Sequence, residues 1–123
     1  MSRLTHILSL YVLAALFVMQ AVAQEKSVNP GINDAFENPD VEAFAERFEV
    51  ESREVFARRH ALVAACQIEP GQTVADIGAG TGLFTRLFAD AVGQEGRVIA
   101  VDISQKFLDR IRANSRQRNQ SNV

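Results

Sequence analysis

The chain has 123 residues, of which 47% are hydrophobic and 23% are charged, and its formal net charge at pH 7 is −2. This length and composition predict one small globular domain, and the balanced charge gives no indication of nucleic-acid binding. Cys66 is the single cysteine, which excludes an intramolecular disulfide. Because no basic neighbour would activate its thiol, we expect Cys66 to be a small buried apolar side chain.

The first 23 residues have the pattern of a secretory signal peptide. Arg3 gives a short positive region, residues 7–19 are apolar apart from Ser9, and residues 21–23 form a small-x-small cleavage pattern. We therefore expect export to the periplasm or the cell exterior. The alternative is an uncleaved leader as a membrane anchor, although the apolar stretch is shorter than the ~20 residues that a spanning helix needs. Any membrane contact is expected through this leader alone.

A linker over residues 24–39 leads to a helical region expected over residues 40–70. Asp40 is the expected N-cap, and apolar residues recur at helical spacing on both sides of an expected break near Glu51. This apolar stripe, expected to pack on the sheet, consists of Val41, Phe44, Ala45, Phe48, Val55, Phe56, Leu62, Val63 and Cys66. A solvated charged face is expected from Glu42, Glu46, Arg47, Glu49, Glu51, Arg53 and Glu54.

The most informative segment is a strand, a glycine-rich loop and a helix, followed by a second strand. Residues 74–77 form a short apolar run typical of a buried parallel strand, and residues 78–82 contain three glycines in the pattern G-x-G-x-G. Residues 83–92 then have helical periodicity, and residues 97–101 are a second apolar run that ends at Asp102. An acidic residue about 20 positions after such glycines is placed to bind a ribose.

The same residues indicate which nucleotide the loop prefers. A dinucleotide fingerprint has Gly or Ala where this chain has Leu83, and Asp76 would repel a pyrophosphate docked at the start of the helix. A ligand with a cationic part suits Asp76 better. S-adenosylmethionine fits this description, because its methionine end carries an ammonium and a sulfonium group and its adenosine supplies a ribose.

Residues 74–85 and 98–104 resemble the first two motifs of the class I S-adenosylmethionine-dependent methyltransferases. By that resemblance, the loop under the methionine end of the cofactor consists of Asp76, Gly78, Ala79, Gly80, Thr81 and Gly82. Asp102 would bind the ribose hydroxyls, and Ile103 would lie against the adenine. No catalytic residue is named, because in this family the residues that select the acceptor follow the fourth strand.

Three of these residues have structural alternatives. The Thr81 hydroxyl and the Asp102 carboxylate are of types that commonly cap helices. Asp76 could instead bond loop N–H groups without touching a ligand. The one histidine outside the leader, His60, has no second ligand nearby, so we expect no metal site and a surface or partly packed role.

The resemblance implies an α/β fold with a Rossmann-like, doubly wound parallel sheet. It also implies that the helical region before the first strand is a lid or flank that in some members touches cofactor or substrate. Only its first two strands and their flanking helices are recognisable, so residues 71–123 are interpreted as an incomplete cofactor-binding domain. The helix after Asp102 should bury Phe107, Leu108 and Ile111 and expose Lys106, Arg110 and Arg112. The polar residues 114–122 are interpreted as a helix exit and a loop toward a third strand, with a frayed tail as the alternative.

The resemblance therefore implies transfer of a methyl group from S-adenosylmethionine, with this chain supplying the cofactor-binding half. The acceptor is unknown and is expected to be a small molecule, and the oligomeric state is left open. One alternative is a non-catalytic relic or interaction module that keeps the motif. The other is an NAD-binding oxidoreductase fragment, which Leu83 and Asp76 disfavour.

Overall fold

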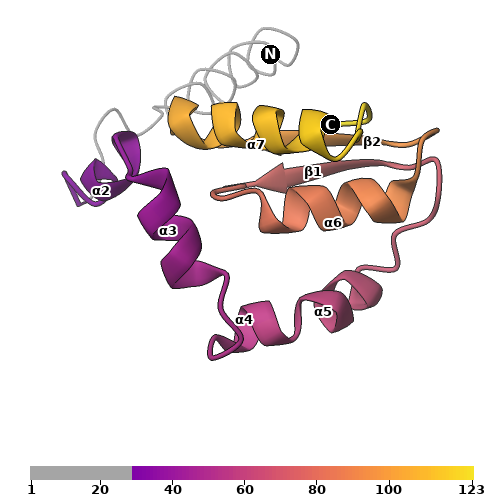
Figure 1. Ribbon diagram of the computed structural model, residues 1–123, viewed down its shortest axis with the longest axis horizontal. Helices are drawn as coiled ribbons and strands as arrows, with labels where there is room; N and C mark the ends of the chain where they lie inside the picture. The colour runs from indigo at the N-terminus through magenta and orange to yellow at the C-terminus, as the bar shows by residue number, and fades with distance from the viewer. Residues whose placement is uncertain (1–28) are drawn as a thin grey trace, which may run out of the picture. The chain divides into compact units, whose positions relative to one another are not determined.

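The computed structural model describes residues 29–123 (Figure 1). The predicted leader over residues 1–23 and the first part of the predicted linker lie outside this range. Residues 33–123 form one compact unit, and the description below concerns that unit. Within the described range, no helix has the length and apolar character needed to cross a membrane.

The order of the elements agrees with the sequence pattern. They are α2 (Asp34–Glu37), α3 (Val41–Phe48), α4 (Glu54–Ala57), α5 (Arg59–Ala65), β1 (Thr73–Ile77), α6 (Leu83–Val92), β2 (Arg97–Val101) and α7 (Gln105–Gln117). The Asp40 side chain caps α3 by accepting a hydrogen bond from the Ala43 N–H at 3.1 Å. The expected break near Glu51 is a turn between α3 and α4.

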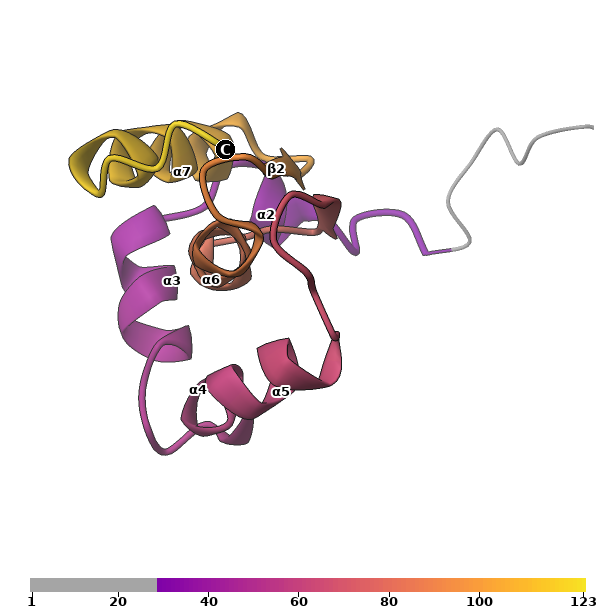
Figure 2. The same cartoon turned by 90° about the vertical axis from the view of Figure 1, so that its right-hand side faces the viewer.

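The two strands form a parallel pair connected by α6. Their register runs from Thr73 opposite Arg97 to Ile77 opposite Val101. Figure 2 shows α6 and α7 on the same side of the strands, and both helices contact β2. The opposite face is open in the part of the chain that the structure describes. Its apolar side chains are exposed: Ile77 (74%), Ile99 (45%) and Val101 (43%).

The buried core lies between the strands and α6. Its central residues are Ala89 and Val92 on α6 and Val98 on β2, all at most 2% exposed. Ile68, Val74 and Phe88 pack around them. The α7 side chains Phe107 and Ile111 are also buried, as the helical pattern predicted, and Leu108 is partly buried. The α6 connection between β1 and β2 therefore has a packed apolar face that holds the loop before it in place.

The sequence predicted that the helical region before β1 packs on the sheet. In the structure it packs on helices instead. Phe44 on α3 makes an edge-to-face contact with Phe107 on α7, with ring centroids 5.4 Å apart, and α5 contacts α6. The expected apolar stripe does not continue through the break, and Val55, Leu62 and Cys66 are exposed. The reason is that the chain turns after α3, so residues at the same helical spacing beyond the turn face a different direction.

The polar C-terminal segment is docked, and the predicted helix exit near residue 114 is wrong because α7 continues to Gln117. The Asn122 side-chain amide donates hydrogen bonds to the carbonyls of Ala89 and Gly93, each at 2.8 Å. The Gln120 amide likewise donates to the Arg86 carbonyl at 2.9 Å. The last four carbonyls of a helix lack intrahelical partners, and Asn122 satisfies the Ala89 carbonyl in this stretch of α6 as well as that of the C-cap residue Gly93.

The Asn122 carbonyl also accepts a hydrogen bond from the Val98 N–H of β2 at 2.7 Å. The last residues therefore lie beside the edge of β2 rather than fraying into solvent. This position is compatible with the loop toward a third strand that the sequence predicts, which stays a prediction.

Gly82 should be the glycine of the loop that tolerates substitution least. Its φ is +82°, and an added Cβ would lie 2.6 Å from Cγ1 of the buried Ile111. Left-handed strain and overpacking together predict that Gly82→Ala lowers the free energy of unfolding by about 2–4 kcal/mol in urea titrations followed by circular dichroism. Gly71 has φ +86°, and an added Cβ would have no neighbour within 4 Å. Gly71→Ala should therefore be destabilised by the left-handed strain alone. Equal losses for the two variants would show that the Ile111 contact is unimportant.

Candidate functional site

The glycine loop lies between β1 and α6, at the carboxyl ends of the parallel strands where α/β proteins bind ligands. Gly78, Gly80 and Gly82 have φ of +76°, +51° and +82°, a region that other L-residues rarely adopt. The N–H groups of Gly78 and Ala79 both donate to the Val101 carbonyl, at 2.8 and 3.0 Å. The loop is therefore bonded to the end of β2, which gives it a fixed position beside Asp102.

Asp102 connects this loop to the start of α7. One carboxylate oxygen accepts a hydrogen bond from the Gly80 N–H and the other accepts one from the Ser104 N–H, both at 2.8 Å. The predicted alternative role of Asp102 as a helix cap is wrong, because Ser104 is the N-cap residue of α7 and Asp102 bonds the N–H groups of Ser104 and Gly80 instead. A carboxylate oxygen can accept more than one hydrogen bond, so both oxygens keep capacity for ribose hydroxyls. The ribose-binding role stays a prediction.

Asp76 is a partly buried carboxylate at the end of β1. Its Oδ2 accepts a hydrogen bond from the Thr85 hydroxyl on α6 at 2.6 Å. Burial raises the pKa of Asp76, the Thr85 hydrogen bonds oppose that rise, and the negative charge of Asp102 adds to it. No cation among residues 29–123 forms an ion pair with Asp76. A cationic ligand would therefore relieve an unfavourable buried charge.

A cavity of about 230 Å³ opens over the loop. It is lined by Asp76, Gly78, Ala79, Gly80, Thr81, Leu83 and Phe84 of the predicted site region and by Phe48, Glu49, Arg53 and Val55 of the preceding helical region. The predicted site residues Gly82, Asp102 and Ile103 are outside its lining. Gly82 instead packs against Ile111, while Ile103 is 64% exposed and offers an open apolar surface next to Asp102. The structure thus gathers five of the eight predicted residues into one cavity.

Glu49 is the most important cavity residue that sequence reasoning missed, since it was expected on a solvated face. Its side chain is only 16% exposed and forms an ion pair with Arg86 of α6. Burial acts to raise the pKa of Glu49, but hydrogen bonds from Arg86 and Thr81 and the positive charges of Arg86 and Arg110 outweigh it and lower the pKa. The sequence carries no local signal for this bond, because the two residues are 37 positions apart.

Thr81 and Arg110 also differ from expectation. The N-cap of α6 is Gly82 with no side-chain hydrogen bond, so Thr81 is not its cap; Thr81 is buried and helps to lower the pKa of Glu49. The Arg110 side chain was expected on the surface but is only 20% exposed and forms an ion pair with Glu42 of α3. Both contacts join the helical region to the Rossmann-like part of the chain.

A larger cavity, about 670 Å³, lies between β2, α7 and the last residues of the chain. It contains none of the predicted site residues and no carboxylate side chain. The smaller cavity is therefore the candidate site, since it combines the glycine loop with charged groups of both signs.

Removing the Glu49 charge should loosen the helical region. Glu49→Gln is expected to lower the free energy of unfolding by about 1–2 kcal/mol at pH 7, between the values for exposed and buried ion pairs. Because the pKa of Glu49 is lowered in the folded state, this loss should be complete above the ordinary value of 4.5 and disappear as pH falls through the lowered pKa. Urea titrations at several pH values measure it.

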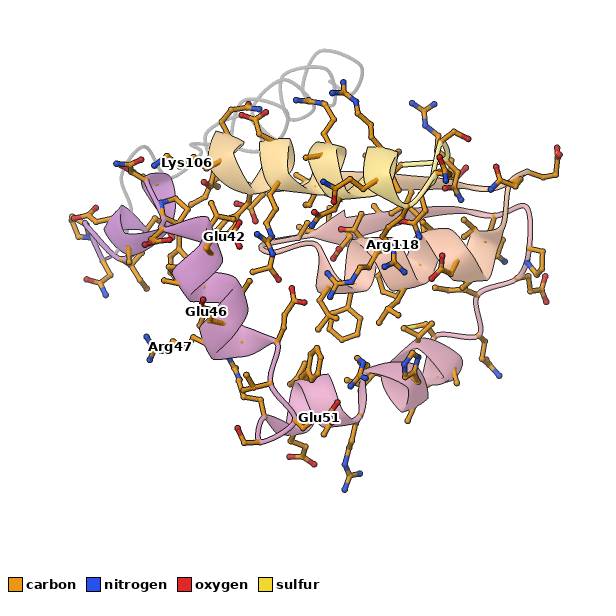
Figure 3. The ribbon with its side chains drawn as sticks, viewed as in Figure 1. Glu42, Glu46, Arg47, Glu51, Lys106 and Arg118 are labelled. Carbon is orange, nitrogen blue, oxygen red and sulfur yellow. The ribbon has the colours of Figure 1, made fainter. Side chains whose placement is uncertain are left out.

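The matched control for that experiment is Glu46→Gln. Glu46 lies on α3, whose C-cap residue is Glu49, and it is exposed and has no ion pair within the described residues (Figure 3). A pH-independent difference between Glu49→Gln and the unmodified chain would argue against the ion pair.

Comparison with known proteins matches the glycine-loop half of the chain to one family. Residues 74–123 match the model of a methyltransferase domain. The chain is 41% identical over 51 residues to the ubiquinone/menaquinone biosynthesis C-methyltransferase UbiE of Hydrogenovibrio crunogenus, covering 42% of this chain and 20% of that protein. It is 37% identical over 60 residues to the arsenite methyltransferase of Halobacterium salinarum, covering 49% and 15% respectively. The chain thus spans a fifth or less of these curated relatives.

A solved structure has a similar fold. It is a SAM-dependent methyltransferase from Aquifex aeolicus, with a TM-score of 0.57 and 22% sequence identity over 70% of this chain and 45% of that one. The predicted α/β fold class is confirmed by this likeness and by the parallel strand pair. Residues 74–123 are therefore similar in sequence to methyltransferase domains, and the chain shares the Rossmann-like fold of a methyltransferase structure.

Proposed function

We propose that the chain binds S-adenosylmethionine at the glycine loop and supplies the cofactor-binding part of a methyltransferase. The observation that carries this proposal is the Asp76 carboxylate, which is partly buried in the loop cavity without a cationic partner among the described residues. A pyrophosphate would be repelled there, whereas an ammonium group would be attracted. The match of residues 74–123 to a methyltransferase domain supports the same ligand.

The residues present fit the two ends of this cofactor. The cavity volume is below the ~300 Å³ typical of a complete ligand pocket, so it suits the methionine end alone. In this proposal, Asp76 holds the ammonium group, the loop backbone lies under the methionine end, Asp102 accepts the ribose hydroxyls and Ile103 contacts the adenine. When bound, S-adenosylmethionine supplies an electrophilic methyl group. The chain's own residues orient it, which can contribute several kcal/mol to such a reaction.

The methyl acceptor is proposed to be a small molecule. The names of the matching relatives do not favour one chemical class of acceptor. The names of the relatives include a C-methyltransferase of quinone biosynthesis, an arsenite methyltransferase and a protein-L-isoaspartate O-methyltransferase. These names describe acceptors of different chemical classes. Export through the leader over residues 1–23 is proposed from the sequence of that segment, with membrane anchoring as its alternative.

The proposal is tested by calorimetric titration of the full chain with S-adenosylmethionine, S-adenosylhomocysteine and NAD. We expect the first two to bind and NAD not to bind. Asp102→Ala should weaken binding at least about tenfold, a loss of about 1.4 kcal/mol. Asp109→Ala is the matched control, because Asp109 is an exposed carboxylate on α7 outside the cavity. Binding of NAD alone would favour the oxidoreductase, and a folded chain that binds none of the three would favour the non-catalytic module.

The pH dependence of binding tests the role of Asp76. The charged carboxylate is the form that attracts an ammonium group, so affinity should be constant at neutral pH and fall about tenfold per unit once pH drops below the pKa of Asp76. Because that pKa is raised above the ordinary 3.8, the fall should begin at a higher pH than for a solvated aspartate. Asp76→Asn should bind more weakly and lose the pH dependence. The same pH profile in Asp76→Asn would assign the titration to another group.

A further inference from the structure

A polar cavity of about 270 Å³ lies between the end of α3, α6 and α7. We call it the arginine cavity. Three of its six lining residues are arginines, one is a carboxylate, two are side-chain amides and none is apolar. The proposed function does not use these arginines. The lining consists of Glu49, Arg86, Arg110, Asn114, Gln117 and Arg118.

Helix α7 presents most of this lining from one face. Arg110, Asn114 and Arg118 follow one another at intervals of four residues, so their side chains project from the same side of the helix. Figure 3 shows Arg118 reaching from the C-terminal end of α7 toward α6. There its guanidinium lies 3.8 Å from the Asp90 carboxylate, which is beyond hydrogen-bond length. Because Arg86 lines the cavity from α6, cations of two helices converge on one space.

The two more buried arginines keep hydrogen-bond donors that no described residue uses. The Nε–H of Arg110 is buried and has no acceptor among the described residues, although Nη1 of the same side chain pairs with Glu42. Arg86 directs two nitrogens at Glu49, and a guanidinium has five N–H donors in all. A buried donor without an acceptor is unfavourable, so an acceptor group placed in this cavity would relieve it.

The lining has an excess of positive charge. Its three guanidinium groups face one carboxylate, that of Glu49, which Arg86 holds by both oxygens. The carboxylates that pair with the other two arginines, Glu42 and Asp90, are more than half exposed and lie outside the cavity lining. Solvent screens such exposed pairs, so they compete weakly with an anion that enters the cavity.

We propose that the arginine cavity binds a phosphate-type oxyanion, either free or as the terminal group of a phosphate ester. Such a group has at least three acceptor oxygens that point in different directions, whereas the two oxygens of a carboxylate lie in one plane. The phosphate therefore suits guanidinium and amide donors that come from two helices. The cavity volume is below the ~300 Å³ of a complete ligand pocket, which favours a compact group. This site does not depend on cofactor binding.

The first test measures the binding of inorganic phosphate to the full chain, by calorimetric titration and by the thermal unfolding midpoint, with sodium chloride keeping the ionic strength constant. A ligand that binds only the folded chain raises that midpoint. We expect Arg118→Gln to weaken phosphate binding about tenfold or more. Arg116→Gln is the matched control, because it removes the same charge from α7 at an exposed position outside the arginine cavity. Its affinity should stay within about twofold of the unmodified chain.

Arg110 is tested together with its ion-pair partner. Arg110→Gln loses both the guanidinium and the ion pair with Glu42, whereas Glu42→Gln loses the ion pair and keeps the guanidinium. We expect Arg110→Gln to bind phosphate about tenfold more weakly and Glu42→Gln to bind it at least as well as the unmodified chain. Equal losses in the two variants would show that the ion pair, and not the Arg110 donor, is responsible.

Vesicles distinguish the two sources of the oxyanion. Phosphatidylcholine vesicles with and without phosphatidic acid are sedimented with the unmodified chain and with Arg118→Gln. Binding of free phosphate that depends on Arg118 shows that the oxyanion alone suffices. Binding that depends on Arg118 and occurs only on vesicles with phosphatidic acid assigns a lipid headgroup, and either result supports the site. The proposal fails if neither probe binds, or if Arg118→Gln and Arg116→Gln weaken binding equally, because a diffuse charge effect then accounts for it.

Discussion

The carboxylate of Asp102 is the group that gives the candidate site its shape. It accepts backbone hydrogen bonds from Gly80 in the first loop and from Ser104 at the start of α7, so a single side chain aligns the turns after both strands. The three loop glycines have positive φ, and a glycine has no side chain that could hold this conformation by its own contacts. The bonds to Asp102 and to the Val101 carbonyl maintain it instead, which places the cavity at the carboxyl ends of the strands.

The second wall of the cavity comes from the helical region, and directional contacts attach it. Glu49 bonds to Arg86, Arg110 bonds to Glu42, and Phe44 packs edge-to-face on Phe107. Apolar burial alone is non-directional and would permit α3 to slide along α7. Ion pairs with fixed partners specify one arrangement, at the cost of partly desolvating the charges. The cavity therefore depends on long-range polar contacts as much as on the glycine loop.

The sequence predicted the elements well where a local pattern determines them. The bounds of α6 and β2 agree with their apolar periodicity, and the cap at Asp40 has a recognisable local signature. The sequence-based prediction failed where tertiary contacts determine the environment of a residue. Glu49 is indistinguishable in sequence from its solvated neighbours until Arg86 is brought beside it, and Cys66 is exposed because the chain turns after α3. The loop residues could be named from their motif, whereas the cavity-lining residues of the helical region could be identified only from the structure.

The docking of the last residues has a consequence for how the molecule opens. Asn122 satisfies carbonyls at the end of α6, and its own carbonyl accepts the Val98 N–H within β2. A chain terminus is ordinarily the first segment to fray. Here its release would expose acceptors of a helix about 30 residues earlier and the amide of a buried strand residue, so terminus, helix end and strand form one cooperative unit. Hydrogen exchange at Val98 would therefore report the detachment of the C-terminus rather than the separation of the two strands.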